Sequence, residues 1–111
     1  MFTLRKPESE KKYQEEKKSV SDCPFCTEEV IHSWKNWSLV PNRYPYDLVA
    51  NKHDLLILKA HRSEPNKEEL TEFEEIKKMK FTSEYHCLIE NFVQRQSVPG
   101  HFHIHILRYK E

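Results

Sequence analysis

The stretch "GHFHIHIL" (residues 100–107) carries a histidine at every second position: His101, His103 and His105. Side chains alternate between the two faces of a β-strand, so the three imidazoles are predicted to share one face and the intervening apolar residues the other. A neutral imidazole nitrogen can attack phosphorus or bind zinc. Three interpretations therefore stand open: a polar face of a core strand, a metal site, or a strand that carries a nucleophile.

The rest of the chain predicts an α+β fold with a mainly antiparallel sheet and one good helix. The helix is expected over residues 63–80, with Asn66 as its N-cap and Glu69 three residues later. Apolar residues recur in it every three positions on one face: Leu70, Phe73, Ile76 and Met79. Apolar runs and alternating patterns predict strands at residues 36–41, 54–62, 85–93 and 101–109.

The chain of 111 residues suits one domain. Residues 1–22 are rich in both acidic and basic side chains, and we expect a charged arm that is a frayed helix or disordered. The domain itself is predicted to span residues 23–111.

The composition excludes several classes of function. Eighteen basic residues balance eighteen acidic ones, so no net charge favours a stable nucleic-acid partner. No apolar run approaches the roughly 18 residues that cross a membrane, and the first residues lack the apolar core of a secretory signal. Gly100 is the only glycine, which argues against a glycine-rich phosphate loop. We therefore expect a cytoplasmic protein whose three cysteines are thiols or metal ligands.

The motif "CPFC" places Cys23 and Cys26 at the spacing of half a zinc knuckle. One CxxC alone is equally compatible with zinc binding, redox chemistry or chance. The chain has no second CxxC, so any further zinc ligands would have to be histidines.

Four motifs, taken in order, resemble the histidine-triad (HIT) superfamily of nucleotide hydrolases and transferases. The motifs are "VPNRYP" (40–45), "HDLLILKAHR" (53–62), "YHCLIENF" (85–92) and "HFHIHIL" (101–107). Together with the cysteine pair, the resemblance covers about residues 23–108. The resemblance implies an antiparallel five-stranded sheet with one main helix, commonly paired into a homodimer.

The resemblance also implies a reaction at the α-phosphate of a nucleotide, such as a nucleoside phosphoramidate or a dinucleoside polyphosphate. His103 would attack and form a nucleotidyl-histidine, His105 would hydrogen-bond the phosphoryl oxygens or orient His103, and His53 would support the triad. Four more residues would contact the substrate at its ribose, phosphate or leaving group: Asn42, Asn91, Gln96 and Ser97.

The zinc-bearing branch of the superfamily, similar also to galactose-1-phosphate uridylyltransferases, implies a structural zinc ion. Its ligands here would be Cys23, Cys26, His61 and His101. Such a Cys₂His₂ set is tetrahedral with no open position.

Two segments depart from the commonest family pattern. "QSVPGH" is one residue longer before the triad and resembles the diadenosine-polyphosphate phosphorylase-like branch, and "FVQRQ" stands where glycines are usual. The missing glycines and the short segment after the triad motivate an alternative, a non-catalytic nucleotide-binding or zinc-stabilised adaptor module on the same scaffold. A third interpretation is a purely structural zinc module with a histidine-rich strand.

Overall fold

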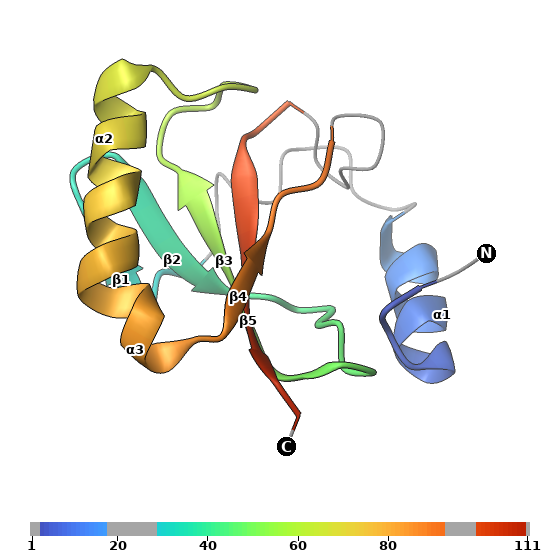
Figure 1. The fold of residues 1–111 in the computed structure, drawn as a ribbon. Helices are drawn as coiled ribbons and strands as arrows, with labels where there is room; N and C mark the ends of the chain where they lie inside the picture. The colour runs from blue at the N-terminus through green and yellow to red at the C-terminus, as the bar shows by residue number, and fades with distance from the viewer. Residues whose placement is uncertain (1–2, 18–28, 93–99, 111) are drawn as a thin grey trace.

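The computed structural model describes residues 3–17, 29–92 and 100–110, and a five-stranded sheet forms its centre (Figure 1). The strand order is β1-β2-β3-β5-β4, and every neighbouring pair is antiparallel. The strands are β1 (His32–Ser33), β2 (Trp37–Pro41), β3 (Ala50–Leu58), β4 (Cys87–Ile89) and β5 (His103–Tyr109). The predicted α+β class with an antiparallel five-stranded sheet and one main helix is confirmed.

β3 is the central strand, as its apolar run predicts. Residues 55–58 are buried on both faces because β2 and β5 flank the strand and side chains cover both sides of it. The strand begins at Ala50 and ends at Leu58, earlier at both ends than the predicted 54–62. The histidine that follows, His61, therefore lies in a connection and not in the strand.

The main helix, α2 (Lys67–Ile76), begins where the sequence predicts. The side chain of Asn66 accepts a hydrogen bond from the Glu69 N–H at 2.8 Å, and the Glu69 carboxylate accepts one from the Asn66 N–H at 2.7 Å. This reciprocal capping satisfies two backbone donors of the first turn. The chain then continues through a π-helical turn, η2 (Lys77–Phe81), and the short α3 (Thr82–Glu84).

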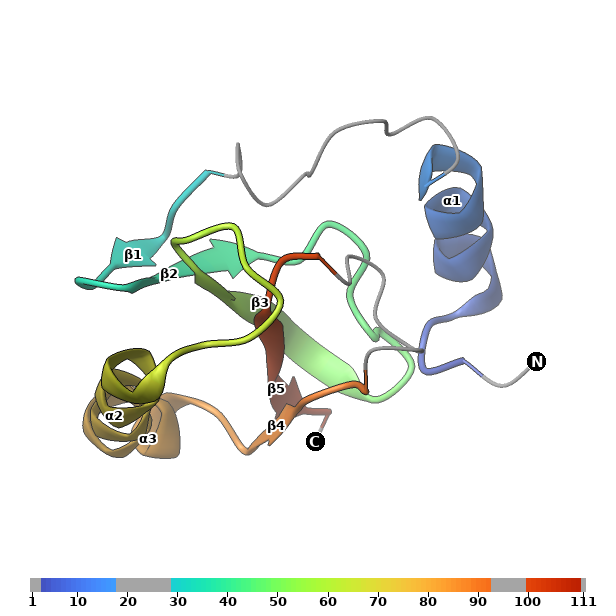
Figure 2. The ribbon, with the colours of Figure 1, turned by 90° about the horizontal axis from the view of Figure 1, so that it is seen from above.

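The helical layer covers one face of the sheet, and the larger hydrophobic core lies between them (Figure 2). Phe73 and Ile76 are buried there, whereas Leu70 and Met79 are 46% and 84% exposed. The prediction that all four residues share one buried face is thus wrong for Leu70 and Met79. Nine residues at about 100° each turn a helix by two and a half turns, so Leu70 and Met79 point in opposite directions.

α1 (Pro7–Lys17) lies apart from this layer, against the loop between β2 and β3 (Figures 1 and 2). Part of the predicted arm is therefore helical, and the division of the chain at residue 22 stays a prediction. None of the helices in the described ranges is long and apolar enough to cross a membrane.

Candidate active site

The triad face of the sheet is defined here by His53, His103 and His105, which project from the two central strands. β3 and β5 pair so that Ile57 lies opposite His103 and Leu55 opposite His105. His53 lies two residues before Leu55 on β3 and therefore diagonally across from His105. All three imidazoles are at most 5% exposed. The apolar residues that alternate with them on β5 join the core under α2, as predicted.

His103 has a defined tautomer. Its Nδ1 lies 2.9 Å from the backbone oxygen of His101, and a carbonyl oxygen can only accept. Nδ1 therefore carries the proton, and Nε2 carries the lone pair. A buried neutral imidazole with its lone pair on Nε2 is the form that a nucleophile or a base requires.

Two successive hydrogen bonds set the tautomers of His53 and His105. The backbone N–H of Tyr46 donates to Nδ1 of His53 at 2.9 Å, so the proton of neutral His53 is on Nε2. That Nε2–H lies 2.9 Å from Nδ1 of His105 and donates to it. The proton of His105 is then on its own Nε2, which makes this atom a donor.

Nε2 of His105 faces two polar side chains. The Nδ2 group of Asn91 lies 3.2 Å from it, and both atoms are donors in this tautomer, so this contact is not a hydrogen bond. Nδ2 of Asn91 donates to the Tyr46 hydroxyl at 3.4 Å, and that hydroxyl lies 3.5 Å from Nε2 of His105. The rings of Tyr46 and His105 also stack, with centroids 5.0 Å apart and planes 21° apart. Tyr46 thus contacts the triad through its backbone, its ring and its hydroxyl.

Asn42 lies at the other end of the His53–His105 pair. Its Oδ1 accepts a hydrogen bond from the Tyr44 N–H at 2.8 Å, so the remaining end of the amide is the Nδ2 group. Nδ2 lies 3.0 Å from Nε2 of His53, but both atoms are donors in the tautomer set by Tyr46, so this contact is not a hydrogen bond.

The triad imidazoles are neutral near pH 7. Burial, together with the positive charge of Arg5, lowers the pKa of His53 to about 4. Burial and the neighbouring histidines lower the pKa of His105 to about 3, and burial also lowers the pKa of His103. These bases are therefore available without prior deprotonation.

The architecture matches a solved structure. A histidine triad protein from Clostridium difficile aligns with a TM-score of 0.55 and 22% sequence identity, over 83% of this chain and 93% of that chain. The chain has the histidine-triad fold. No protein-family model and no curated protein sequence matches it.

Within this histidine-triad fold, some of the remaining predicted site residues lie beside the triad and others lie outside the described residues. The structure brings Asn42 and Asn91 to opposite ends of the His53–His105 pair. Gln96, Ser97, Cys23 and Cys26 lie outside the described residues. The sequence predicts no role for Tyr46, which directly follows "VPNRYP" (40–45), because only the folded loop carries it to His105.

His61 and His101 meet where β3 ends and β5 begins. Their ring centroids are 5.0 Å apart, edge to face. Nε2–H of His101 donates to the Leu58 carbonyl at 2.5 Å, which leaves the lone pair on Nδ1. Metal-binding histidines usually donate their second ring N–H to a carbonyl or carboxylate, so this donor fits a zinc ligand. Among the described residues alone, no group of three or more histidine, cysteine or acidic side chains could hold a metal.

Hydrogen bonds from α2 hold the segment that carries His61. Arg62 pairs with the buried carboxylate of Glu69, and its backbone oxygen accepts from the Phe102 N–H at 2.7 Å. The first turn of α2 thereby links the residue after His61 to the residue after His101.

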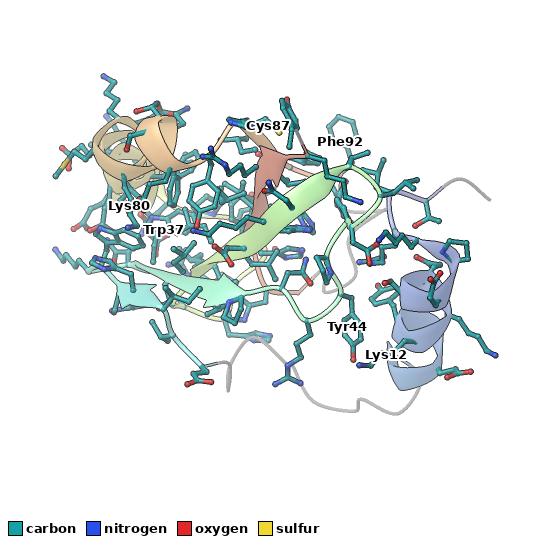
Figure 3. The ribbon with its side chains drawn as sticks, turned by 90° about the horizontal axis from the view of Figure 1, so that it is seen from below. Lys12, Trp37, Tyr44, Lys80, Cys87 and Phe92 are labelled. Carbon is teal, nitrogen blue, oxygen red and sulfur yellow. The ribbon has the colours of Figure 1, made fainter. Side chains whose placement is uncertain are left out.

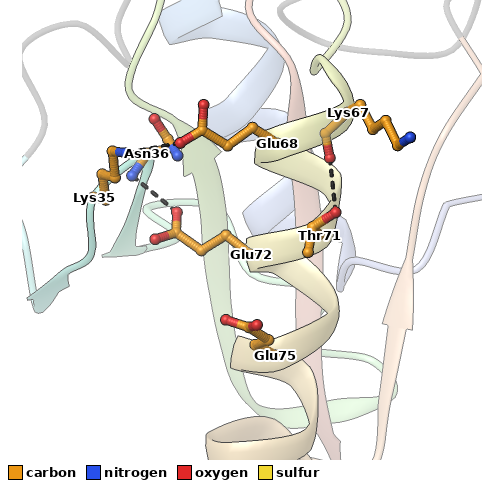
Figure 4. A pocket seen from close by; sticks show the side chains of 7 residues that line it. All are labelled: Lys35, Asn36, Lys67, Glu68, Thr71, Glu72 and Glu75. Atoms are coloured by element: carbon orange, nitrogen blue, oxygen red, sulfur yellow. Dashed lines mark hydrogen bonds and ion pairs between the residues drawn. The ribbon is translucent and has the colours of Figure 1, made fainter.

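A separate hollow lies between α2 and the turn that joins β1 to β2 (Figure 4). Its polar groups pair with one another: Lys35 Nζ lies 2.7 Å from Glu68, and the Asn36 N–H donates to Glu72 at 2.9 Å. The triad points to the other face of the sheet, so this hollow takes no part in the candidate active site.

The lowered histidine pKa values predict a loss of stability in mild acid. A histidine in the unfolded chain has a pKa near 6.5. Between about pH 6.5 and pH 4, His53 and His105 therefore bind protons in the unfolded chain but stay neutral in the folded protein. The contribution of these two histidines to the unfolding free energy is therefore fully present above the pKa of the unfolded state and is lost as the pH falls below it. Each pKa unit corresponds to about 1.4 kcal/mol, so we expect the unfolding free energy to fall by several kcal/mol by pH 4.

Thermal unfolding at half-unit steps from pH 7.5 to 4.5 measures this effect. Four carboxylates of the described residues have a lowered pKa and lose their contribution to stability only below their ordinary pKa values of 3.8 to 4.5: Glu10, Asp47, Glu69 and Glu84. A His105→Gln variant should show a shallower decline than the wild type. A melting temperature that is flat between pH 6.5 and 5 would refute the prediction.

Proposed function

We propose that the protein is a nucleotidyl hydrolase or transferase that cleaves at the α-phosphate of a nucleoside phosphoramidate or dinucleoside polyphosphate. The observation that carries the proposal is the tautomer of His103. Its Nδ1–H donates to the His101 carbonyl, so the lone pair of a buried neutral imidazole is on Nε2. The histidine-triad fold supports the same reaction class through the family resemblance of "HFHIHIL".

The first step is a displacement at phosphorus. Nε2 of His103 forms a bond to the α-phosphorus, and the bond to the leaving amine or phosphate breaks with its electron pair going to the leaving group, which takes up a proton from solvent when it is an amine. The positive charge that develops on the imidazole is stabilised by the hydrogen bond from Nδ1 to the His101 oxygen. In the second step water or another acceptor attacks the phosphorus, the P–N bond breaks, and neutral His103 is restored.

His105 is assigned to the non-bridging phosphoryl oxygens. The chain from the Tyr46 N–H through His53 makes Nε2 of His105 a donor. A donor fixed before substrate binds stabilises developing negative charge without reorganising during the reaction. His53 acts through His105 and sets its tautomer.

Substrate contacts are assigned to four polar side chains. The Nδ2 group of Asn42 can donate to a ribose hydroxyl, and the amide of Asn91 lies beside Nε2 of His105, where phosphate would bind. Gln96 and Ser97, which precede the triad, are assigned to the phosphate and the leaving group from the resemblance.

A structural zinc ion completes the proposal, with Cys23, Cys26, His61 and His101 as ligands. The paired imidazoles and the lone pair on Nδ1 of His101 support this assignment. A closed Cys₂His₂ site contributes folding free energy and offers no position for substrate. Pairing of two copies into a homodimer stays a prediction from the resemblance.

Variants of a zinc ligand and of the nucleophile should have different effects on the zinc content. We expect Cys23→Ser to lower the zinc content well below one ion per chain and to lower the melting temperature, because structural zinc binding is coupled to folding. His103→Ala should keep the zinc content of the wild type. Elemental analysis of purified protein and thermal unfolding measure both effects. If His103→Ala also loses the metal, the assignment of His101 and His103 to different roles is wrong.

A turnover screen tests the proposed function. Nucleoside phosphoramidates and dinucleoside polyphosphates that differ in base are incubated with the protein, with and without inorganic phosphate, and the products are separated by chromatography. The proposal predicts release of a nucleoside monophosphate, or of a diphosphate when inorganic phosphate is the acceptor. Nucleotide binding without turnover across the panel would instead support the non-catalytic binding module.

A further inference from the structure

The N-terminal segment, defined here as residues 3–17, docks on the loop that sets the triad tautomers. The Lys6 N–H donates to Asp47 Oδ1 at 2.7 Å, and the Ser9 hydroxyl donates to Asp47 Oδ2 at 2.5 Å. The Leu48 N–H donates to the Leu4 carbonyl at 3.0 Å. Figure 3 shows Tyr44 of this loop facing α1, near Lys12. The segment therefore holds the loop by backbone and side-chain bonds.

Arg5 is the largely covered centre of this contact. Its side chain is 11% exposed, and Nε donates to the Tyr44 carbonyl at 2.6 Å. The guanidinium lies over two rings, 4.1 Å from the centroid of Tyr13 and 5.0 Å from that of Tyr46. Its charge is balanced by Glu10, with Nη1 3.1 Å from Oε1.

These contacts connect Arg5 to the histidines in two bonded steps. Arg5 holds the carbonyl of Tyr44, and two residues later the N–H of Tyr46 donates to Nδ1 of His53. The guanidinium also lies over the Tyr46 ring that stacks on His105. A planar guanidinium can donate from its edge while its flat face packs on a ring, whereas an ammonium group has no flat face to stack. The fork and flat face of arginine therefore match these contacts better than lysine does.

We propose that Arg5 is a positioning residue of the triad, which fixes the 44–46 turn so that the Tyr46 N–H selects the Nε2–H tautomer of His53 and hence the donor form of His105. The residue touches neither substrate nor the reacting atoms. Its consequence for turnover rests on the proposed function, whereas its effect on the tautomer does not.

The tautomer is measured directly by ¹⁵N NMR of the imidazole nitrogens at pH 7.5, where the Nδ1–H and Nε2–H forms give different shifts. We expect Arg5→Gln to change His53 from the single Nε2–H form to a mixture of the two. Arg5→Lys should restore the Nε2–H form only in part. The matched control is Ser9→Ala, which removes another docking bond of the same segment and should leave the His53 spectrum unchanged.

Turnover provides the second readout. Misplacing a catalytic group by about 1 Å can lower a rate about 100-fold, so we expect Arg5→Gln to lower kcat about 10- to 100-fold with KM changed less than kcat. Ser9→Ala should keep the kcat of the wild type. Circular dichroism identifies variants that have unfolded; if Arg5→Gln is among them, the spectrum of Arg5→Lys decides the inference.

The outcomes distinguish the two proposals. A single Nε2–H form of His53 in folded Arg5→Gln overturns the inference, whatever the rates are. A changed tautomer in a protein that turns over none of the substrates supports the positioning role and rejects the proposed function.

Discussion

His103→Ala is expected to abolish turnover, with a loss on the order of 10⁴-fold or more in kcat, because removal of a nucleophile leaves only binding and electrostatic contributions. In the wild type the imidazole is 2% exposed and is held by the bond from Nδ1 to the His101 oxygen. Nδ1 of His53 and Nδ1 of His105 both accept hydrogen bonds, so the proposed nucleophile is Nε2 of His103. KM should change far less than kcat, since His103 forms its bond after substrate has bound.

A control variant and a check of folding allow the loss of activity to be attributed to His103. His32→Ala removes an exposed histidine from the edge strand β1 and should keep the activity of the wild type. Steady-state kinetics are measured on samples whose circular dichroism and melting behaviour show that the variant is folded. Full activity in folded His103→Ala would remove His103 from the mechanism.

Trp37→Ala is expected to lower the free energy of unfolding by about 3–5 kcal/mol, the usual range for truncating a large buried aromatic side chain. Trp37 is fully buried, and its Nε1–H donates to the Glu69 carbonyl at 2.9 Å. Its ring packs between the sheet and α2, with centroids 5.7 Å from Phe73 and 5.9 Å from Phe102. Domains of this size are stable by only about 5–15 kcal/mol, so this loss removes a large share of the stability of the fold.

Urea unfolding followed by circular dichroism measures the difference. Leu70→Ala is the matched control, because Leu70 is an apolar residue of α2 that is 46% exposed, and it should change stability by less than about 1 kcal/mol. A loss below about 1.5 kcal/mol in Trp37→Ala would contradict the packing described for this core.

The parts of the fold that the sequence predicts are those determined by local pattern. The alternation at residues 103–107 predicts which residues share a face, whereas His101 lies before the strand and turns to His61. The apolar run at 55–58 predicts a central strand. The Asn66–Glu69 pair predicts the start of α2 because capping depends on residues three apart. These signals are local, so the tertiary structure does not override them.

The parts that the sequence does not predict depend on tertiary contacts. Cys87–Ile89 is a much shorter strand than the predicted 85–93, since strand length is set by pairing with β5 and not by apolar content alone. The roles of Tyr46 and Arg5 arise from a loop and an N-terminal segment that meet only after folding. No spacing in the sequence relates Arg5 to residues about forty positions away.

The histidine-rich strand combines residues with two different surroundings. His101 turns to His61 at one end of β5, whereas His103 and His105 lie on the triad face with His53. The resemblance assigns zinc to one histidine and phosphorus chemistry to the next, and this difference in surroundings supports that proposal.

The most direct test of the account is to trap the intermediate. Protein turning over a substrate labelled at the α-phosphate is quenched in alkali, digested, and the labelled peptide is located by mass spectrometry. The account predicts one nucleoside monophosphate on His103, stable in alkali, labile in acid and absent from His103→Ala. Turnover with the label on another residue, or with no label on the protein at any time point, would contradict it.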